Sequence, residues 1–238
     1  MWSLDVVGSP DPDQEVIRKI EELAWATSLI YGASGWHEGP PFKANFTLYV
    51  PKLRENHIQA AEPHFSRMHL VTSSLFLPSI CAYFPPHVIQ TFLRSYFSVC
   101  LAIWVGQGRP TIEVTQEFVS KTDAFPQEPI GDRVTKPARD TLTPETITPN
   151  PWLAIIQSAL EHPDNHVCKT QRALGHWSRM FGGRPQGYWA KTSPKIGAVR
   201  LKGVELLDGT LFVRVAGMTQ AAKGWMREGQ QRRDWSLE

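Results

Sequence analysis

The sequence of 238 residues has few cysteines and no long uncharged apolar run. The three cysteines, Cys81, Cys100 and Cys168, are an odd number without C-x-x-C spacing, which predicts reduced thiols in a cytoplasmic protein. The longest apolar stretch, 96–105, is about half of the roughly 18 residues that a membrane span needs. Residues 1–5 show no basic region before an apolar run, so no signal peptide is expected.

An excess of one charge is also missing, because 25 lysines and arginines face 23 acidic residues. This balance indicates neither nucleic acid nor a membrane as a partner. The motifs of phosphate loops, serine hydrolases and zinc proteases are absent. The glycine-rich segment 182–187 has the wrong spacing for a dinucleotide fingerprint and follows a predicted helix. A Rossmann-type NADPH or flavin site is therefore not supported.

Hydrophobic periodicity predicts helices along much of the chain and no regular alternation of strands and helices. Asp11 and Asp164 precede two of these helices as N-cap candidates, and Gly32 and Gly182 follow them as helix ends. The fold class is mainly α: an irregular helical domain with long proline-rich connections. The expected helices cover residues 11–32, 87–105, 151–160 and about 165–181.

Three further segments are less regular. Residues 68–84 form an apolar run that Pro78 interrupts. Residues 107–150 are rich in proline and predict a long loop. Residues 211–215 alternate between apolar and polar positions, so they are interpreted either as a strand or as the start of a last helix. The nine tryptophans predict a core rich in large aromatics, and a pocket for a flat aromatic ligand is the alternative.

The segment 164–169 contains the local pattern that most suggests a reactive or metal-binding site. His166 and Lys169 are three apart, so they share one face of the predicted helix. A protonated lysine cannot bind a metal. If its amine takes up carbon dioxide, the resulting carbamate is an oxygen donor, and the pair then suits non-heme iron. The alternative interpretation is a capped helix with an exposed lysine and a surface histidine.

A second pattern opens the apolar run at Met68-His69-Leu70-Val71-Thr72-Ser73-Ser74. A single histidine at such a place is most simply a core histidine that bonds a backbone carbonyl. The alternative is that His69 is a metal ligand or a proton donor.

Four blocks in this order resemble the questin oxidase-like family. The blocks at 68–78 and 164–174 are similar to the family's His-Leu-Val-Thr-Ser-Ser and His-x-x-Lys segments. The turn at 106–110 and the segment 211–219 are similar to a Gly-Arg-Pro turn and a C-terminal block of the family. The resemblance implies that residues 1–238 are the C-terminal portion of a questin oxidase-like domain.

The family resemblance implies an oxidoreductase that uses dioxygen on an anthraquinone-type aromatic polyketide in fungal secondary metabolism. Some members are described as NADPH-dependent Baeyer–Villiger oxidases, and one branch is a dioxygenase with non-heme iron. His69, His166 and Lys169 match ligand positions of that iron site, with Lys169 as the carboxylated lysine. The implied cofactors are Fe(II) and, as reductant, NADPH. Trp177, two turns beyond Lys169, is interpreted mainly as a core residue and alternatively as a pocket residue.

The chain departs from the family in two respects. The resemblance implies that two further histidine ligands belong to an N-terminal half outside this sequence, and an incomplete ligand set weakens metal binding. The polar segment 49–67 breaks the apolar pattern and is interpreted as an insertion, so His57 and His64 are not used as ligands. The alternative function is therefore a catalytically inactive fragment or binding partner without a complete metal site.

Overall fold

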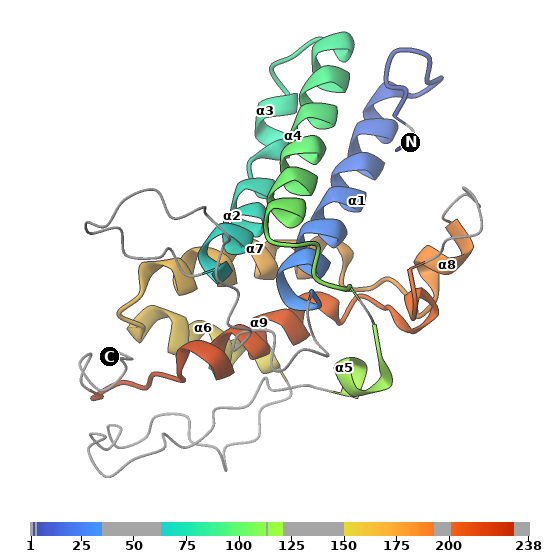
Figure 1. The fold of residues 1–238 in the computed structure, drawn as a ribbon. Helices are drawn as coiled ribbons and strands as arrows, with labels where there is room; N and C mark the ends of the chain where they lie inside the picture. Colours follow the sequence, from blue (N-terminus) through green and yellow to red (C-terminus); the bar gives the residue numbers. More distant parts are fainter. Residues whose placement is uncertain are drawn as a thin grey trace, which may run out of the picture. The chain divides into compact units, whose positions relative to one another are not determined.

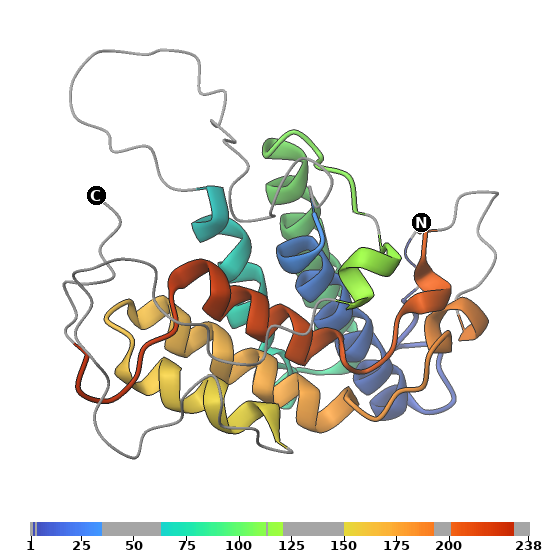
Figure 2. The same ribbon diagram turned by 90° about the horizontal axis from the view of Figure 1, so that it is seen from below.

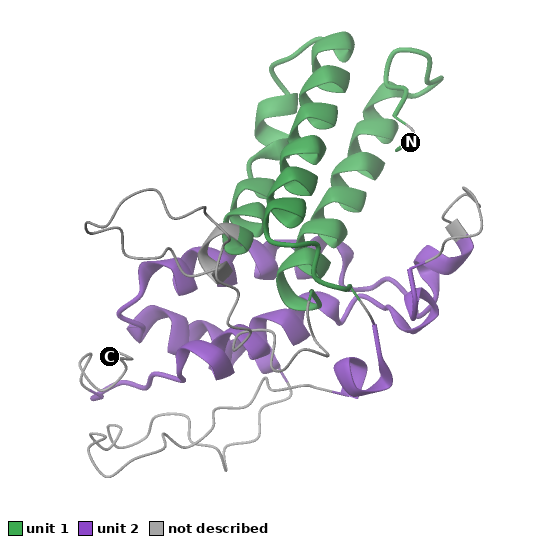
Figure 3. Ribbon diagram, in the orientation of Figure 1, with its two compact units in different colours: residues 1–113 green, residues 114–238 purple. Residues whose placement is uncertain are grey.

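The computed structural model describes residues 2, 4–34, 63–112, 114–120, 150–192 and 201–230. Within these ranges the chain is helical, contains no strand, and forms one isolated β-bridge between Ser34 and Ile112. The predicted mainly α class is confirmed. The chain divides into two compact units, residues 1–113 and residues 114–238, which Figure 3 shows in two colours.

The first unit consists of α1 (Pro12–Gly32), α2 (Pro63–Ser74), α3 (Leu77–Cys81) and α4 (Pro86–Gly106). Helix α1 packs against the other three helices, and α2 also packs against α4 (Figure 1). Ile30 of α1, Leu70 of α2 and Cys100 of α4 are buried together. Tyr96 and Trp104 pack against them. Apolar side chains at helical spacing thus hold the unit together.

Local sequence explains both long helices of this unit. The Asp11 carboxylate accepts a hydrogen bond from the Gln14 N–H at 3.0 Å, so it caps α1 as predicted. Proline occupies the first turn of α1 and of α4, where its missing N–H has no helical partner to lose. Helix α4 ends at Gly106, and Gly108 follows with a φ of 84°, a left-handed conformation that suits glycine.

Helix α4 is also, among the described helices, one whose length and hydropathy would allow it to cross a membrane. It carries one charged residue, Arg94, which is why the sequence shows no uncharged span of that length. Only 17% of its most apolar 18-residue window is buried. The core helix of a soluble protein can have the same length and hydropathy, so this property alone assigns no membrane to α4.

The second unit contains α5 (Gln116–Ser120), α6 (Pro151–Glu161), α7 (Asn165–Phe181), α8 (Tyr188–Thr192), the 3₁₀ helix η2 (Val204–Leu206) and α9 (Leu211–Lys223). Helices α6, α7 and α9 pack against one another, and Figure 2 shows them side by side. The largest fully buried side chains of this unit include Trp177, Phe212 and Trp225. The prediction that tryptophans fill the core is thus confirmed for Trp177 and Trp225.

The structure decides the ambiguous segment at residues 211–215 in favour of a helix. Leu211, Phe212 and Val215 are buried, and the helix continues to Lys223. The Gln171 side chain of α7 donates a hydrogen bond of 2.9 Å to the Ala216 carbonyl in this interface. Packing on both α6 and α7 buries more than one face of α9, which explains why its sequence shows only a weak helical pattern.

Two predicted segments lie largely outside the described residues. Of the interpreted insertion at 49–67, positions 63–67 belong to helix α2, and the rest is not described. Of the predicted loop at 107–150, residues 116–120 form α5, and residues 121–149 are not described. Both interpretations therefore stay predictions.

Candidate metal site on helix α7

Helix α7 begins where the sequence places a cap. The Asp164 carboxylate oxygen Oδ1 accepts a hydrogen bond of 2.9 Å from the His166 N–H, which satisfies one of the unpaired donors of the first turn. The same oxygen lies 2.8 Å from Nδ1 of the His166 ring. One carboxylate thus holds both the backbone and the imidazole of His166.

This contact fixes the proton on the His166 ring. An ionised carboxylate can only accept hydrogen bonds, so Nδ1 of His166 carries the proton that bonds to Asp164. In the neutral ring the lone pair then resides on Nε2. Metal-binding histidines are commonly held in this way, with one nitrogen donating to a carboxylate and the other facing the metal. The tautomer of His166 therefore suits a metal ligand.

The Asp164 carboxyl group is kept ionised despite partial burial. Burial raises its pKa, but the hydrogen bonds from the His166 backbone and ring and the nearby positive charge of Lys223 outweigh burial. The pKa of Asp164 is therefore lower than its ordinary value. Its negative charge is therefore available near neutral pH to orient the His166 ring through the hydrogen bond to Nδ1.

A second histidine stabilises the turn before α7. The Asp164 N–H donates to Nδ1 of His162 at 3.0 Å, so the proton of this neutral ring is on Nε2. That nitrogen lies 3.0 Å from the Lys223 carbonyl oxygen and donates to it. His162 thereby connects the start of α7 to the end of α9 and is a positioning residue that the sequence analysis missed. The pattern His162-Pro-Asp164-Asn-His166 was its only sequence indication.

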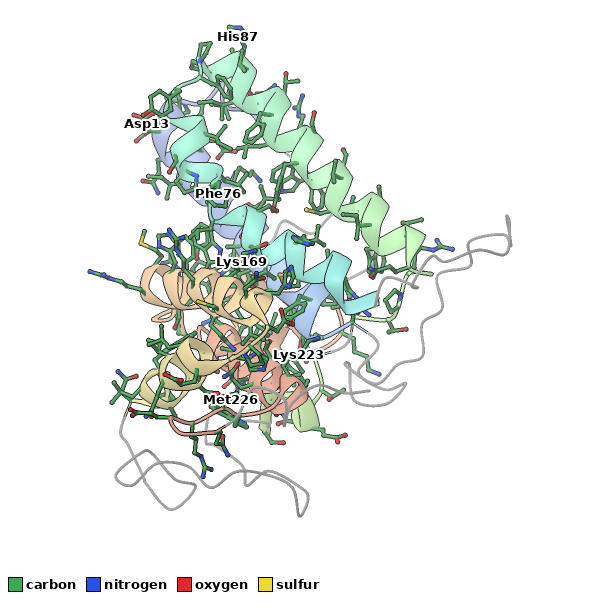
Figure 4. The ribbon with its side chains drawn as sticks, turned by 90° about the vertical axis from the view of Figure 1, so that its left-hand side faces the viewer. Asp13, Phe76, His87, Lys169, Lys223 and Met226 are labelled. Carbon is green, nitrogen blue, oxygen red and sulfur yellow. The ribbon has the colours of Figure 1, made fainter. Side chains whose placement is uncertain are left out.

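Lys169 lies one turn after His166 on α7, as predicted, and its side chain is exposed. Its amine is 3.4 Å from the Asn165 side-chain oxygen, a long hydrogen bond to the preceding turn. Figure 4 labels Lys169 on this helix, together with Lys223, the last residue of α9, and Met226, which follows that helix. His166 and Lys169 thus share one helix face, as predicted. A capped helix with an exposed lysine, the alternative interpretation, would look the same.

His166 and Lys169 fit part of a metal site. They would supply one nitrogen donor and, after carboxylation of Lys169, one oxygen donor, which is a suitable pair for iron. The described residues contain no cluster of three or more His, Cys, Asp or Glu side chains that could hold a metal ion. A complete ligand set thus needs donors beyond these two.

The third predicted ligand, His69, lies on α2 in the first unit, and its side chain is exposed. The interpretation of His69 as a core histidine is therefore wrong. The reason is the helix register, because Met68 and Leu70 on either side turn into the core while His69 does not. Its role as a metal ligand stays a prediction.

Trp177 occupies a core position, as its main interpretation predicted. Only 1% of its surface is exposed, and its ring stacks on Phe181 at a centroid distance of 5.7 Å. The His176 ring meets it edge-on at 4.7 Å. Its part in the molecule is to anchor α7 in the second unit.

Comparison with known proteins adds a family match. A family model described as questin oxidase-like matches residues 2–174. The matched range contains His69, His166 and Lys169 and ends before the segment 211–219. Neither a curated protein nor a solved structure matches the chain.

Proposed function

Since this chain belongs to the questin oxidase-like family and is an oxidoreductase of small molecules, we propose that it uses dioxygen to oxidise an anthraquinone-type aromatic polyketide. The product would be a ring-opened or ring-oxygenated polyketide. The cytoplasm is the proposed location, and NADPH is the proposed source of electrons if the reaction is a monooxygenation.

The arrangement of Asp164 and His166 at the start of α7 carries the proposal. The Asp164 carboxylate oxygen lies 2.8 Å from Nδ1 of His166 and keeps the proton on that nitrogen, so the lone pair of the neutral ring is on Nε2. The exposed Lys169 amine, one turn away, is accessible to carbon dioxide. A simple N-cap would need only the contact between Asp164 and the His166 backbone, so the second contact supports a ligand role.

Iron bound by His166 and the carboxylated Lys169 would supply the redox chemistry that oxidation by dioxygen needs. The protein's own contribution is to orient His166 through its contact with the Asp164 carboxylate, and His162 in turn holds the Asp164 backbone. Carboxylation of Lys169 requires its amine in the unprotonated form, since a protonated amine cannot attack carbon dioxide. We therefore expect loading with iron to depend on bicarbonate.

Iron content after anaerobic reconstitution with Fe(II) and bicarbonate tests the proposal. We expect bound iron in the unaltered chain and loss of most of it in His166→Ala and Lys169→Ala, because each removes a donor. Asp164→Ala should lower iron affinity by about 10- to 100-fold, the usual effect of losing a residue that orients a ligand. His69→Ala examines the remaining predicted ligand in the same assay.

His176→Ala is the matched control, since His176 lies on the same helix and is exposed but belongs to no proposed ligand set. It should retain iron. An unaltered chain that binds no iron under these conditions would support the alternative function, an inactive fragment or binding partner. Iron that survives in both His166→Ala and Lys169→Ala would contradict the ligand assignment but not the family.

Oxygen uptake with an anthraquinone substrate tests the reaction itself. With the iron-loaded chain we expect uptake that depends on the substrate. A stoichiometric loss of NADPH would identify a monooxygenation, whereas uptake without NADPH would identify a dioxygenation. Substrate-dependent NADPH oxidation by a chain free of iron would contradict the proposed role of the metal.

A further inference from the structure

The outward face of α7 carries basic side chains and no acidic ones. Arg172, His176 and Arg179 are exposed and recur at helical spacing along one side of the helix, and together we call them the basic stripe. Lys169 precedes them on the same side. Helix α7 itself contains no aspartate or glutamate, so no acidic residue of this helix offsets the stripe.

The charges of the basic stripe are not neutralised by described parts of the protein. Among the described residues, no carboxylate forms an ion pair with Arg172 or Arg179. Burial lowers the pKa of His176, and the positive charges of Arg179 and Arg172 lower it further. The two arginines are therefore close enough to His176 to repel its charged form, and an anion near them would reduce this repulsion.

The neighbouring helix α6 exposes apolar side chains instead. Leu153, Ile156 and Leu160 follow helical spacing and are 52%, 51% and 71% exposed. We call these three residues the apolar stripe. The opposite side of α6, which includes Ala154, Ile155 and Ala159, is buried in the unit, so the apolar stripe is not part of the core.

The two stripes belong to one helical hairpin. Only residues 162–164 separate α6 from α7, and the helices pack against each other. The Trp152 ring of α6 lies beside Gly175 of α7, where an added Cβ atom would come within 3.6 Å of it. Figure 2 shows the two helices next to each other along their length. The outer faces of both helices are therefore adjacent on the surface of the second unit.

We propose that the α6–α7 hairpin binds the surface of an anionic lipid bilayer. The apolar stripe would enter the boundary between headgroups and acyl chains, and the basic stripe would contact the acidic headgroups. Amphipathic helices that lie on membranes combine these two properties. Each Lys or Arg near such a surface adds about 1 kcal/mol of attraction. This inference does not depend on the proposed enzymatic function.

The observations favour a bilayer over other partners. A twofold interface centred on the basic stripe would bring one basic stripe against another, which is repulsive. Nucleic acid gives no role to exposed Leu and Ile side chains, and single-stranded recognition uses aromatic rings that these stripes lack. Protein interfaces favour aromatic anchors, whereas the apolar stripe is entirely aliphatic.

Flotation of the full chain with lipid vesicles tests the proposal. We expect binding to vesicles of phosphatidylcholine with phosphatidylserine, little binding to phosphatidylcholine alone, and weakening by salt. Arg172→Glu should weaken binding about 30-fold, since it removes one positive charge and adds one negative charge at about 1 kcal/mol each. Leu160→Ser should weaken it about tenfold through lost apolar insertion.

Matched variants separate this face from general surface charge. Lys191→Glu reverses an exposed charge on α8, and Val7→Ser removes a 61% exposed apolar side chain in the first unit. Both should bind vesicles like the unaltered chain, and circular dichroism should show the same helicity for all four variants.

Three results would overturn the proposal. The first is no binding to anionic vesicles, and the second is equal loss in Arg172→Glu and Lys191→Glu. The third is binding to polyglutamate that depends on Arg172 while vesicle binding is unaffected by Leu160→Ser, which would make this face a docking site for an acidic protein.

Discussion

At the scale of single residues, Asp164 has the most consequences. Its carboxylate caps α7, fixes the tautomer of His166 and lies 4.0 Å from the Lys223 amine. The sequence predicts the first of these roles, because Asp at an N-cap position is a common pattern. The other two depend on the side-chain conformation of His166 and on the end of α9.

Two substitutions of Asp164 distinguish the stabilisation by its capping hydrogen bond from the stabilisation by its charge. Asp164→Ala should lower the free energy of unfolding by about 1 kcal/mol, the usual cost of losing an N-cap. Asp164→Asn keeps a capping oxygen and should cost only a few tenths of a kcal/mol from the lost charge at the helix N-terminus. Thermal denaturation at pH 7 measures both, and equal losses in the two variants would contradict the capping role.

The contribution of the Asp164 charge also predicts a pH dependence. Its pKa is lower in the folded protein than in the unfolded chain, where it is about 3.9. The stabilisation is therefore present above that pH and is lost as the pH falls through the lower, folded pKa. The stability difference between the unaltered chain and Asp164→Asn should accordingly vanish in strong acid.

His176 reports the charge of the outer face of α7. Burial and the neighbouring Arg179 and Arg172 lower its pKa below 6.5. Arg179→Gln should raise the pKa of His176 toward the ordinary value, because one repelling charge is removed. Titration of the His176 ring protons by NMR measures this change. Lys191→Gln is the control, and an equal shift in both variants would show that the effect is not local.

At the scale of helices, α7 and α9 show two different relations between sequence and structure. Helix α7 has a cap, a clear apolar face and a glycine end, and the predicted range 165–181 is the observed one. Helix α9 has buried residues around much of its circumference and an αR residue, Thr210, at its start without a side-chain cap. Its helical state follows from its contacts with α6 and α7.

Trp177 is the side chain on which the packing of α7 depends most. Trp177→Ala should lower the free energy of unfolding by about 3–5 kcal/mol, because it leaves a large cavity in a buried site. Met180→Ala is the control on the same helix, since Met180 is 57% exposed and should change stability by less than about 0.5 kcal/mol. Urea denaturation compares the two variants, and similar losses would contradict the core position of Trp177.

At the scale of the whole molecule, the two compact units divide the predicted metal ligands. His69 belongs to the first unit, whereas His166 and Lys169 belong to the second. Sequence spacing predicted that His166 and Lys169 share a helix face, and the structure confirms it. Nothing in the spacing relates His69 to the other two, so that ligand rests on the family resemblance.

The three cysteines provide a test of the fold of both units. Burial raises the pKa of Cys81 to about 11. Burial is also the main cause that raises the pKa of Cys100 to about 11. Cys168, in contrast, is exposed on α7. A disulfide reagent at pH 8 should therefore modify one thiol quickly and the other two at least about 100-fold more slowly, because the thiolate reacts. All three should react quickly after unfolding.

Cys168→Ser should remove the fast phase of this reaction and leave the slow phase unchanged. Two or three fast thiols in the native chain would contradict the burial of Cys81 and Cys100. Quantitative reaction after unfolding without reductant would confirm that the cysteines are reduced, as the sequence predicted.

The sequence by itself determined the helices with strong local features: the caps Asp11 and Asp164, the prolines of the first turns, the glycine ends and the apolar periodicity of 87–105. Capping and periodicity act between residues a few positions apart, so they are visible in the sequence. The helical state of residues 211–215, the exposure of His69 and the second role of Asp164 were decided by tertiary structure. Each depends on contacts with side chains or helix faces whose positions only the folded chain sets.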